Sequence, residues 1–327
     1  MLPLPLLEIA RDQGILIPSA DPTPAEVESA ARWLLSPAAR AIPAVRRYLF
    51  YLKWMDETFH AVAECFPRDN AGRDGRIDAA AMATSAEEML YLANHLYLLA
   101  SHGVDGAVLE CGCFKGFSSC CLSHACAALG RELVVADSFA GLPAPDARRG
   151  EAGYRAGDFA ASLAEVEENV RACGRPERVR FLPGWFAESL AGWSAPLALL
   201  WIDVDLFGST LDVLENVFDA LDPRGAIFSH EFLPAHIRDG EIVAETEPPG
   251  AFGDFFHRRG VAYRALHLAG WTAIVTLPGS VGLGADRLLP ALIGPLRDRD
   301  HRARAARQAI GVRNGMRDLW RRTLGRG

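Results

Sequence analysis

Short apolar segments alternate with helical patterns over much of the chain, and this alternation limits the fold more than any other feature of the sequence. Each apolar run has the length of a buried strand. The runs lie at 107–109, 133–136, 179–182, 197–202 and 226–228, with helical patterns such as 163–173 and 210–221 between them. This order is typical of a parallel sheet covered on both faces, so the sequence predicts a doubly wound α/β domain.

The last part of this pattern differs from the rest. Two apolar runs at 261–268 and 271–277 are separated by Ala269-Gly270 and predict an antiparallel hairpin that closes the sheet. Beyond them the chain becomes basic, with arginine as nearly its only cation, and it has a partly amphipathic helical pattern. We expect this tail to form a helix.

The first part of the chain has helical periodicity without strand signals. A polar, glycine-bearing loop is expected at 67–80, and Ser85 and Glu88 have the spacing of a capping box that opens the next helix. The domain boundaries follow from these changes in pattern. We expect a helical N-terminal region at 1–83, the α/β domain at 84–280 and a basic helical tail at 281–327.

The composition limits where the chain acts and what it binds. A formal net charge of −7 argues against a general nucleic-acid binder. No stretch reaches the roughly 18 apolar residues of a membrane span, and the first residues lack the basic region of a signal peptide. Five of the seven cysteines lie between 111 and 126 without zinc-site spacing, so they are expected to fill the core. We expect a cytoplasmic protein without a disulfide framework.

A carboxylate and glycines follow the first predicted strand, where a doubly wound sheet binds its ligands. Glu110 precedes Gly112 and Gly116, and the spacing is not that of the dinucleotide loop G-x-G-x-x-G. A carboxylate here would repel a pyrophosphate but would accept a hydrogen bond from an ammonium, such as that of S-adenosylmethionine. Asp137 ends the second strand and is placed to accept both hydroxyls of a ribose. An ordinary βα turn and a turn cap are the alternatives for these two features.

Acidic residues and a histidine follow the fourth and fifth predicted strands. Asp203 and Asp205 share one side of the chain as the fourth strand ends, and His230 and Glu231 end the fifth. Oxygen ligands with one imidazole suit Mg²⁺ or Mn²⁺, so Asp203, His230 and Glu231 are predicted to converge on one divalent metal. A hydrogen-bonded polar cluster without a metal is the alternative.

Four strings together resemble the macrocin O-methyltransferase (TylF/MycF) family over about residues 84–277. They are VLECGCFKG at 108–116, ADSFAGLP at 136–143, FLPGWF at 181–186 and IDVDLFGST at 202–210. The resemblance implies a class I methyltransferase (Rossmann-like) fold, S-adenosylmethionine as the methyl donor and a sugar hydroxyl as the acceptor. It also implies a divalent metal, usually Mg²⁺, that grips adjacent hydroxyls of the acceptor.

The resemblance also implies roles for individual residues. The cofactor would be held by Glu110, Gly112 and Gly116 at its methionine part, by Asp137 at its ribose, and by Ser138, Phe139, Gly184 and Trp185 around its adenosine. Asp203 would be a metal ligand or base. The family usually has two aspartates where this chain has His230 and Glu231. The family's lid, here about 144–159, can supply a histidine base, but this segment contains no histidine. Either His230 or Asp203 would therefore be the catalytic base.

The predicted function is S-adenosylmethionine-dependent O-methylation of a sugar or a sugar-bearing small molecule, natural product or glycan, with the help of a divalent metal. The small-molecule acceptor is the expected partner, and the N-terminal helices would form either a substrate cover or a contact in a homo-oligomer. The segment 144–160 is expected to be mobile and to order over the cofactor. A non-catalytic relative that uses the fold to bind a partner is the alternative.

Overall fold

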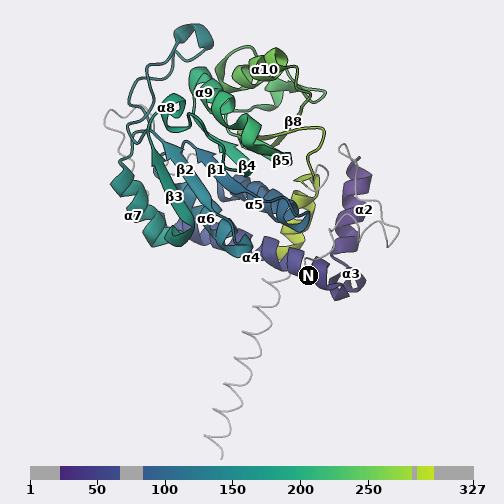
Figure 1. Cartoon of the computed structure of the whole chain (residues 1–327). Helices are drawn as coiled ribbons and strands as arrows, with labels where there is room; N and C mark the ends of the chain where they lie inside the picture. Colours follow the sequence, from purple (N-terminus) through teal and green to yellow (C-terminus); the bar gives the residue numbers. More distant parts are fainter. Residues whose placement is uncertain (1–22, 67–83, 282–285, 298–327) are drawn as a thin grey trace, which may run out of the picture.

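The computed structural model describes residues 23–66, 84–281 and 286–297, and its centre is a seven-stranded mixed sheet (Figure 1). The strand order is β3-β2-β1-β4-β5-β9-β8. The strands are β1 Ala107–Cys111, β2 Leu133–Asp137, β3 Val179–Pro183, β4 Leu197–Ile202, β5 Leu221–Ser229, β8 Arg264–Ala269 and β9 Thr272–Thr276. The first five are parallel, while β9 is antiparallel to both β5 and β8. The predicted parallel sheet and its closing hairpin are therefore confirmed.

Helices cover both faces of this sheet. α5, α6 and α7 lie on one face, and α9 and α10 lie on the other. The helices of the α/β part are α5 Ala86–Ser101, α6 Phe117–Leu129, α7 Leu163–Cys173, the short α8 Phe186–Ser189, α9 Phe207–Val217 and α10 Glu247–Arg259. Successive strand residues such as Val108 and Leu109 join the two opposite cores, because side chains alternate along a strand. The doubly wound architecture is as predicted.

The strand order reverses between β1 and β4, and this reversal positions the site. Connections leave β1 and β4 toward opposite halves of the sheet, which opens a crevice at their carboxyl ends. Glu110 in β1 lies beside Trp201 in β4, and the ends of β2 and β5 flank this pair of strands. The residues that follow β1, β2, β4 and β5 therefore meet at one edge.

The N-terminal helices share the larger core with the α/β part. They are α2 Pro24–Leu34, α3 Pro37–Ala41 and α4 Pro43–Cys65, and α4 lies against α5 and α6. Both α2 and α5 begin with a capping box, Thr23 with Glu26 and Ser85 with Glu88, as the spacing predicts for the second. The loop predicted at 67–80 lies outside the described residues.

The start of the predicted tail is helical and packs onto this core. Residues 289–297 form a helix whose leucines pack with those of α4 and α5, and Arg297 pairs with Asp56. Just before it, the buried carboxylate of Asp286 lies 3.0 Å from Nδ1 of His95. The tail from 298 onward lies outside the described residues. None of the described helices is long and apolar enough to cross a bilayer.

Short elements complete the chain, and the sequence did not predict them. A two-stranded ribbon follows β5, and 3-10 turns connect several of the longer elements. They are β6 Ile237–Arg238, β7 Glu241–Ile242, η1 Ala147–Arg149, η2 Pro176–Arg178, η3 Phe218–Ala220, η4 Pro234–His236 and η5 Asp286–Leu288. The cysteines from 111 to 126 are buried, as expected of core residues.

Candidate functional site

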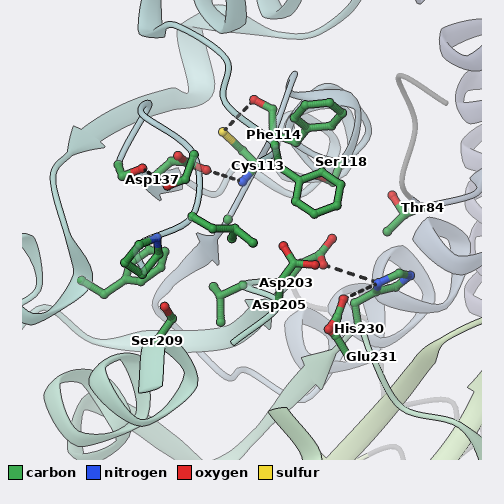
Figure 2. Close-up of a pocket in the computed structure, with 18 of the residues that line it drawn as sticks. Thr84, Cys113, Phe114, Ser118, Asp137, Asp203, Asp205, Ser209, His230 and Glu231 are labelled. Atoms are coloured by element: carbon green, nitrogen blue, oxygen red, sulfur yellow. Dashed lines mark hydrogen bonds and ion pairs between the residues drawn. The ribbon is translucent and has the colours of Figure 1, made fainter. Parts of the chain in front are cut away.

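A cavity of about 270 Å³ opens at the carboxyl ends of the parallel strands (Figure 2). Seven of the predicted site residues line it, namely Gly112, Asp137, Ser138, Trp185, Asp203, His230 and Glu231. The structure thus brings members of both predicted groups to one cavity, Gly112 and Asp137 from the ends of β1 and β2 and the charged residues from the ends of β4 and β5. Glu110, Gly116, Phe139 and Gly184 lie next to lining residues rather than in the wall itself.

Glu110 lies fully buried directly behind the cavity wall. Its Oε2 accepts a hydrogen bond of 2.6 Å from Ser119, and Ser118, which does line the cavity, also donates to the carboxylate. Its Oε1 has no hydrogen-bond partner among the described residues. Burial raises the pKa of Glu110 to about 8 against the opposing effect of the two serines. An ammonium group at this wall would supply the missing charge.

The two predicted glycines meet different requirements. Gly112 has a φ of +82°, and a Cβ there would lie 1.8 Å from the carbonyl oxygen of Asp203, so only glycine lets β1 end against β4. Gly116 has a φ of +89°, and a Cβ there would meet the side chain of Val166 at 2.9 Å. Gly112 therefore forms cavity wall, while packing explains Gly116 and its role in cofactor binding stays a prediction.

Asp137 is held in one orientation by backbone donors. Its Oδ2 accepts from the N–H of Cys113 at 2.8 Å, and its Oδ1 accepts from the N–H of Phe139 at 2.7 Å. The thiol of Cys113 also hydrogen-bonds this carboxylate. Each carboxylate oxygen can accept more than one hydrogen bond, so both remain available as acceptors at the cavity wall. Ser138 supports this turn through a hydrogen bond of 2.8 Å to the carbonyl of Gly141. A vicinal diol such as that of ribose is the ligand that fits this arrangement.

On the opposite wall, three side chains form a compact cluster. Nδ1 of His230 lies 3.0 Å from Oε1 of Glu231 and 3.4 Å from Oδ1 of Asp203, and Figure 2 shows both acids turned toward the ring. One ligand atom from each of the three lies within 4.8 Å of the others. Within the part of the chain that the structure describes, the buried Oε2 of Glu231 has no hydrogen-bond partner. The donor set and this unsatisfied oxygen fit a divalent cation.

The charges of this cluster are strongly coupled. Burial alone would lower the pKa of His230, but the carboxylates of Asp203, Glu231 and Glu88 raise it to about 11. Burial raises the pKa of Asp203 to about 7, with an opposing effect from His230 and a further increase from Glu231. Burial and the charge of Glu231 also raise the pKa of Asp205. The cluster therefore concentrates negative charge around a single imidazole ring.

Several other residues around the cavity were not predicted as site residues. Thr84, Ser118, Phe159 and Trp271 line the cavity, and Tyr154 from the 144–160 segment hydrogen-bonds to Asp205. Glu88, expected only to cap its helix, lies 3.5 Å from Nε2 of His230. These side chains come from elements distant in sequence, and no local spacing marks them.

Non-glycine residues with positive φ concentrate at this cavity. Phe114, Phe159, Asp205 and Glu231 have φ values of +47°, +57°, +61° and +69°, and all four line it. Such backbone costs about 1–3 kcal/mol per residue and is typical of functional sites.

The segment at 144–160 lies beside the cavity and contacts the start of α9. Oε1 of Glu151 accepts from the N–H of Phe207 at 2.7 Å, and its Oε2 accepts from the N–H of Asp146 at 2.6 Å. A hydrogen bond from the N–H of Gly157 to the carbonyl of Leu142 joins the two ends of this segment. Its predicted mobility stays a prediction.

Comparison with known proteins places the chain in a family. The model of the macrocin-O-methyltransferase (TylF) family matches residues 40–237, which is more than half of the chain. The protein belongs to this family. The family model begins at residue 40 and therefore includes all of α4, which lies outside the predicted resemblance. It ends at residue 237, so it covers the predicted resemblance from residue 84 to residue 237 but not from 238 to 277.

Two curated relatives match a shorter part of the chain. The 8-demethyl-8-(2,3-dimethoxy-alpha-L-rhamnosyl)-tetracenomycin-C 4'-O-methyltransferase of Streptomyces olivaceus is 36% identical over 150 residues, 42% of this chain and 57% of that protein. The mycinamicin III 3''-O-methyltransferase of Micromonospora griseorubida is 37% identical over 41% of this chain and 58% of that protein. The chain thus spans less than two thirds of the relatives' length.

A solved structure is similar over more of the chain. The O-methyltransferase NovP superposes with a TM-score of 0.54 at 23% identity and covers 70% of this chain and 99% of that one. This likeness confirms the class I methyltransferase fold that the motifs predict.

Proposed function

We propose that this protein is an S-adenosylmethionine-dependent O-methyltransferase that acts on a hydroxyl of a sugar or a sugar-bearing small molecule. One observation carries the proposal. The carboxylate of Asp137, held by two backbone N–H groups, and the charged cluster of Asp203, His230 and Glu231 line opposite walls of a single cavity (Figure 2). A nucleoside and an acceptor hydroxyl would be held there side by side, and alignment of the two reactants is the main requirement for an in-line methyl transfer.

The donor would lie along the ends of β1 and β2. Asp137 would accept hydrogen bonds from the two ribose hydroxyls, and Ser138, Phe139, Gly184 and Trp185 would surround the adenine. Gly112, Gly116 and Glu110 would hold the methionine part, with Ser118 between Glu110 and the ligand. Bound S-adenosylmethionine supplies an electrophilic methyl group on a sulfonium.

The acceptor would lie against the charged cluster, where its hydroxyl must lose a proton. Both ring nitrogens of His230 already face carboxylates, Nδ1 toward Glu231 and Nε2 toward Glu88. Asp203 borders the cavity, and its carboxylate lies 3.4 Å from this ring and beside the carboxyl group of Glu231. Of the two predicted bases, this arrangement favours Asp203 as proton acceptor, with His230 stabilising the charge that develops.

Asp203, His230 and Glu231 would also hold a divalent cation, Mg²⁺ or Mn²⁺. When bound, such a cation lowers the pKa of a coordinated hydroxyl. The unpartnered oxygen of Glu231 supports this part of the proposal. His230 would act as a ligand only through Nδ1, because Nε2 faces Glu88 on the far side of the ring.

The relatives support the class of acceptor. Their names describe a rhamnosyl tetracenomycin methylated at 4'-O and a mycinamicin methylated at 3''-O. We propose an acceptor of similar chemistry, a sugar hydroxyl on a natural product or glycan. The half-exposed Trp271 at the cavity mouth offers an apolar face for such a ring.

The direct test is transfer of a labelled methyl group from S-adenosylmethionine to a panel of glycosylated natural products and free sugars. We expect transfer to at least one acceptor, its loss after rigorous metal removal with EDTA, and its return with Mg²⁺ or Mn²⁺. Undiminished transfer without metal would remove the cation from the proposal. Binding of the donor without transfer to any acceptor would favour the non-catalytic, partner-binding alternative.

The remaining predictions concern the location of the enzyme in the cell, its partners and its oligomeric state. We propose a cytoplasmic enzyme that does not bind nucleic acid, in keeping with its negative net charge of −7. A homo-oligomer through the N-terminal helices is a further prediction, which light scattering of the purified chain would test.

A further inference from the structure

Glu88 is a buried acid on the acceptor side of the cavity, outside all four strings that carry the family resemblance. It lies in the first turn of α5 with a side chain only 6% exposed. Its Oε2 accepts from the N–H and the hydroxyl of Ser85, at 2.8 Å and 2.7 Å, and so caps the helix. A cap needs only this oxygen, and the other one has different partners.

Oε1 of Glu88 connects α5 to two other elements. It accepts hydrogen bonds of 3.0 Å from both the N–H of Trp271 and the hydroxyl of Thr272, at the turn between β8 and β9. The same oxygen lies 3.5 Å from Nε2 of His230 at the end of β5. One carboxylate thus holds together a helix start, a hairpin turn and the histidine of the site.

The hairpin turn is shaped to admit this carboxylate. Gly270 has a φ of +55°, and a Cβ there would lie 2.2 Å from Oε1 of Glu88. Any other residue at this position would displace the acid from the turn and from His230. The glycine therefore accounts for a close approach as well as for the turn conformation.

The contact with Glu88 determines which ring nitrogen of His230 is directed toward the cavity. With Nε2 directed at Glu88, Nδ1 is directed at Glu231 and Asp203, at 3.0 Å and 3.4 Å. A carboxylate behind a histidine fixes the ring orientation and the nitrogen that carries the proton. Without it, only the contacts of Nδ1 with Glu231 and Asp203 would orient the ring.

We propose that Glu88 is a positioning residue, which holds Nε2 of His230 and thereby presents Nδ1 to the acceptor side of the cavity. The inference rests on the proposed function only for the chemistry that Nδ1 then performs. Glu88 itself is directed away from the reacting groups and is not a catalytic residue.

The test is the substitution Glu88→Gln. Glutamine has nearly the same shape but only one acceptor oxygen. With that oxygen toward the N–H of Trp271, its amide group meets the N–H of Ser85, and the charge beside Nε2 is lost. We expect kcat to fall by about 10–100-fold, the size of effect seen when such outer partners of a histidine are removed. The Kd for S-adenosylhomocysteine should stay within about twofold, because the donor half is distant.

Two matched controls separate positioning from capping and from hairpin support. Glu26→Gln makes the same change in the capping box of α2, where Glu26 accepts from Thr23 and faces solvent. Thr272→Val removes one hydrogen bond to Oε1 and leaves the charge beside His230. Both variants should keep kcat within about twofold of the natural protein.

The ring nitrogens of His230 give a readout independent of activity. In ¹⁵N spectra of the natural protein, assigned with a His230→Gln variant, Nε2 should carry a proton, and in Glu88→Gln this signal should shift. An unprotonated Nε2 in the natural protein would overturn the proposal even if the variant did not fold. Wild-type kcat in folded Glu88→Gln would also overturn it, whereas absence of methyl transfer by the natural protein would count against the proposed function alone.

Discussion

Two buried glutamates, one behind each wall of the cavity, show how differently the two halves are built. Glu110 on the donor side has one oxygen with no hydrogen-bond partner among the residues that the structure describes, and burial raises its pKa to about 8. Burial would also raise the pKa of Glu88 on the acceptor side, yet hydrogen bonds from His230, Ser85 and the N–H of Trp271 lower it to about 2. The donor half thus lacks a positive charge that a ligand would bring, while the acceptor half contains its own.

This difference predicts that substitutions in the two halves affect different steps. Substitutions on the donor side should weaken cofactor binding, and substitutions on the acceptor side should slow the chemical step with the cofactor still bound. Asp137 and Asp203 provide the sharpest pair, since both are strand-end aspartates that line the same cavity.

The largest expected effect is that of Asp203→Asn. The variant loses the proposed proton acceptor and one side of the cation site, so kcat should fall by about 10²–10⁴-fold. The Kd for S-adenosylhomocysteine should change by no more than a few fold. Single-turnover methyl transfer and calorimetry measure the two quantities, and a variant with normal kcat would contradict the assignment of the acceptor wall.

For Asp137→Asn we expect a smaller effect, and on the affinity for the donor rather than on kcat. The amide keeps one acceptor for the backbone but loses the charge that binds the diol, so the Kd for S-adenosylhomocysteine should rise by about 10–100-fold. At saturating donor, kcat should stay within a few fold of the natural value. If kcat fell and donor affinity were unchanged, the separation into two halves would be wrong.

The pH dependence of stability gives the smallest effect and concerns Glu110 alone. Its pKa is about 8 in the folded protein against 4.5 for an ordinary glutamate. The native state therefore retains a proton that the unfolded chain releases, and the free energy of unfolding should fall as the pH rises from about 4.5 to about 8 and then level off. Glu110→Gln should remove about 1–3 kcal/mol of this decline.

Chemical denaturation of the ligand-free natural protein and of Glu110→Gln at several pH values measures that difference. The two curves should converge at low pH and separate toward pH 8, since the glutamine does not titrate. Parallel curves would show that the buried carboxylate is not protonated in the native state.

The donor half was predictable from sequence because each of its parts is local. Asp137 ends a short apolar strand, and the glycine at 112 follows another, so the strand pattern alone places both at one edge. The cluster of Asp203, His230 and Glu231 was predictable for the same reason, because its residues follow or end the neighbouring parallel strands β4 and β5.

The partners of that cluster were not predictable. Glu88 has a complete local explanation as a helix cap, and its contact with His230 exists only because β9 brings the hairpin turn beside the start of α5. Tyr154 meets Asp205 through an irregular segment that has no periodicity to interpret. A pattern of apolar residues determines which strands are neighbours, but it does not indicate which polar side chains reach across them.

The central claim is that the carboxyl ends of β1 and β2 form a binding site for a sulfonium nucleoside. Isothermal titration calorimetry of the purified chain with S-adenosylhomocysteine tests this most directly, with Asp137→Asn as the matched control. The account predicts saturable binding with one ligand per chain, clearly weaker in the variant. Absence of binding heat over a range of temperatures, or equal affinity of the two proteins, would contradict it.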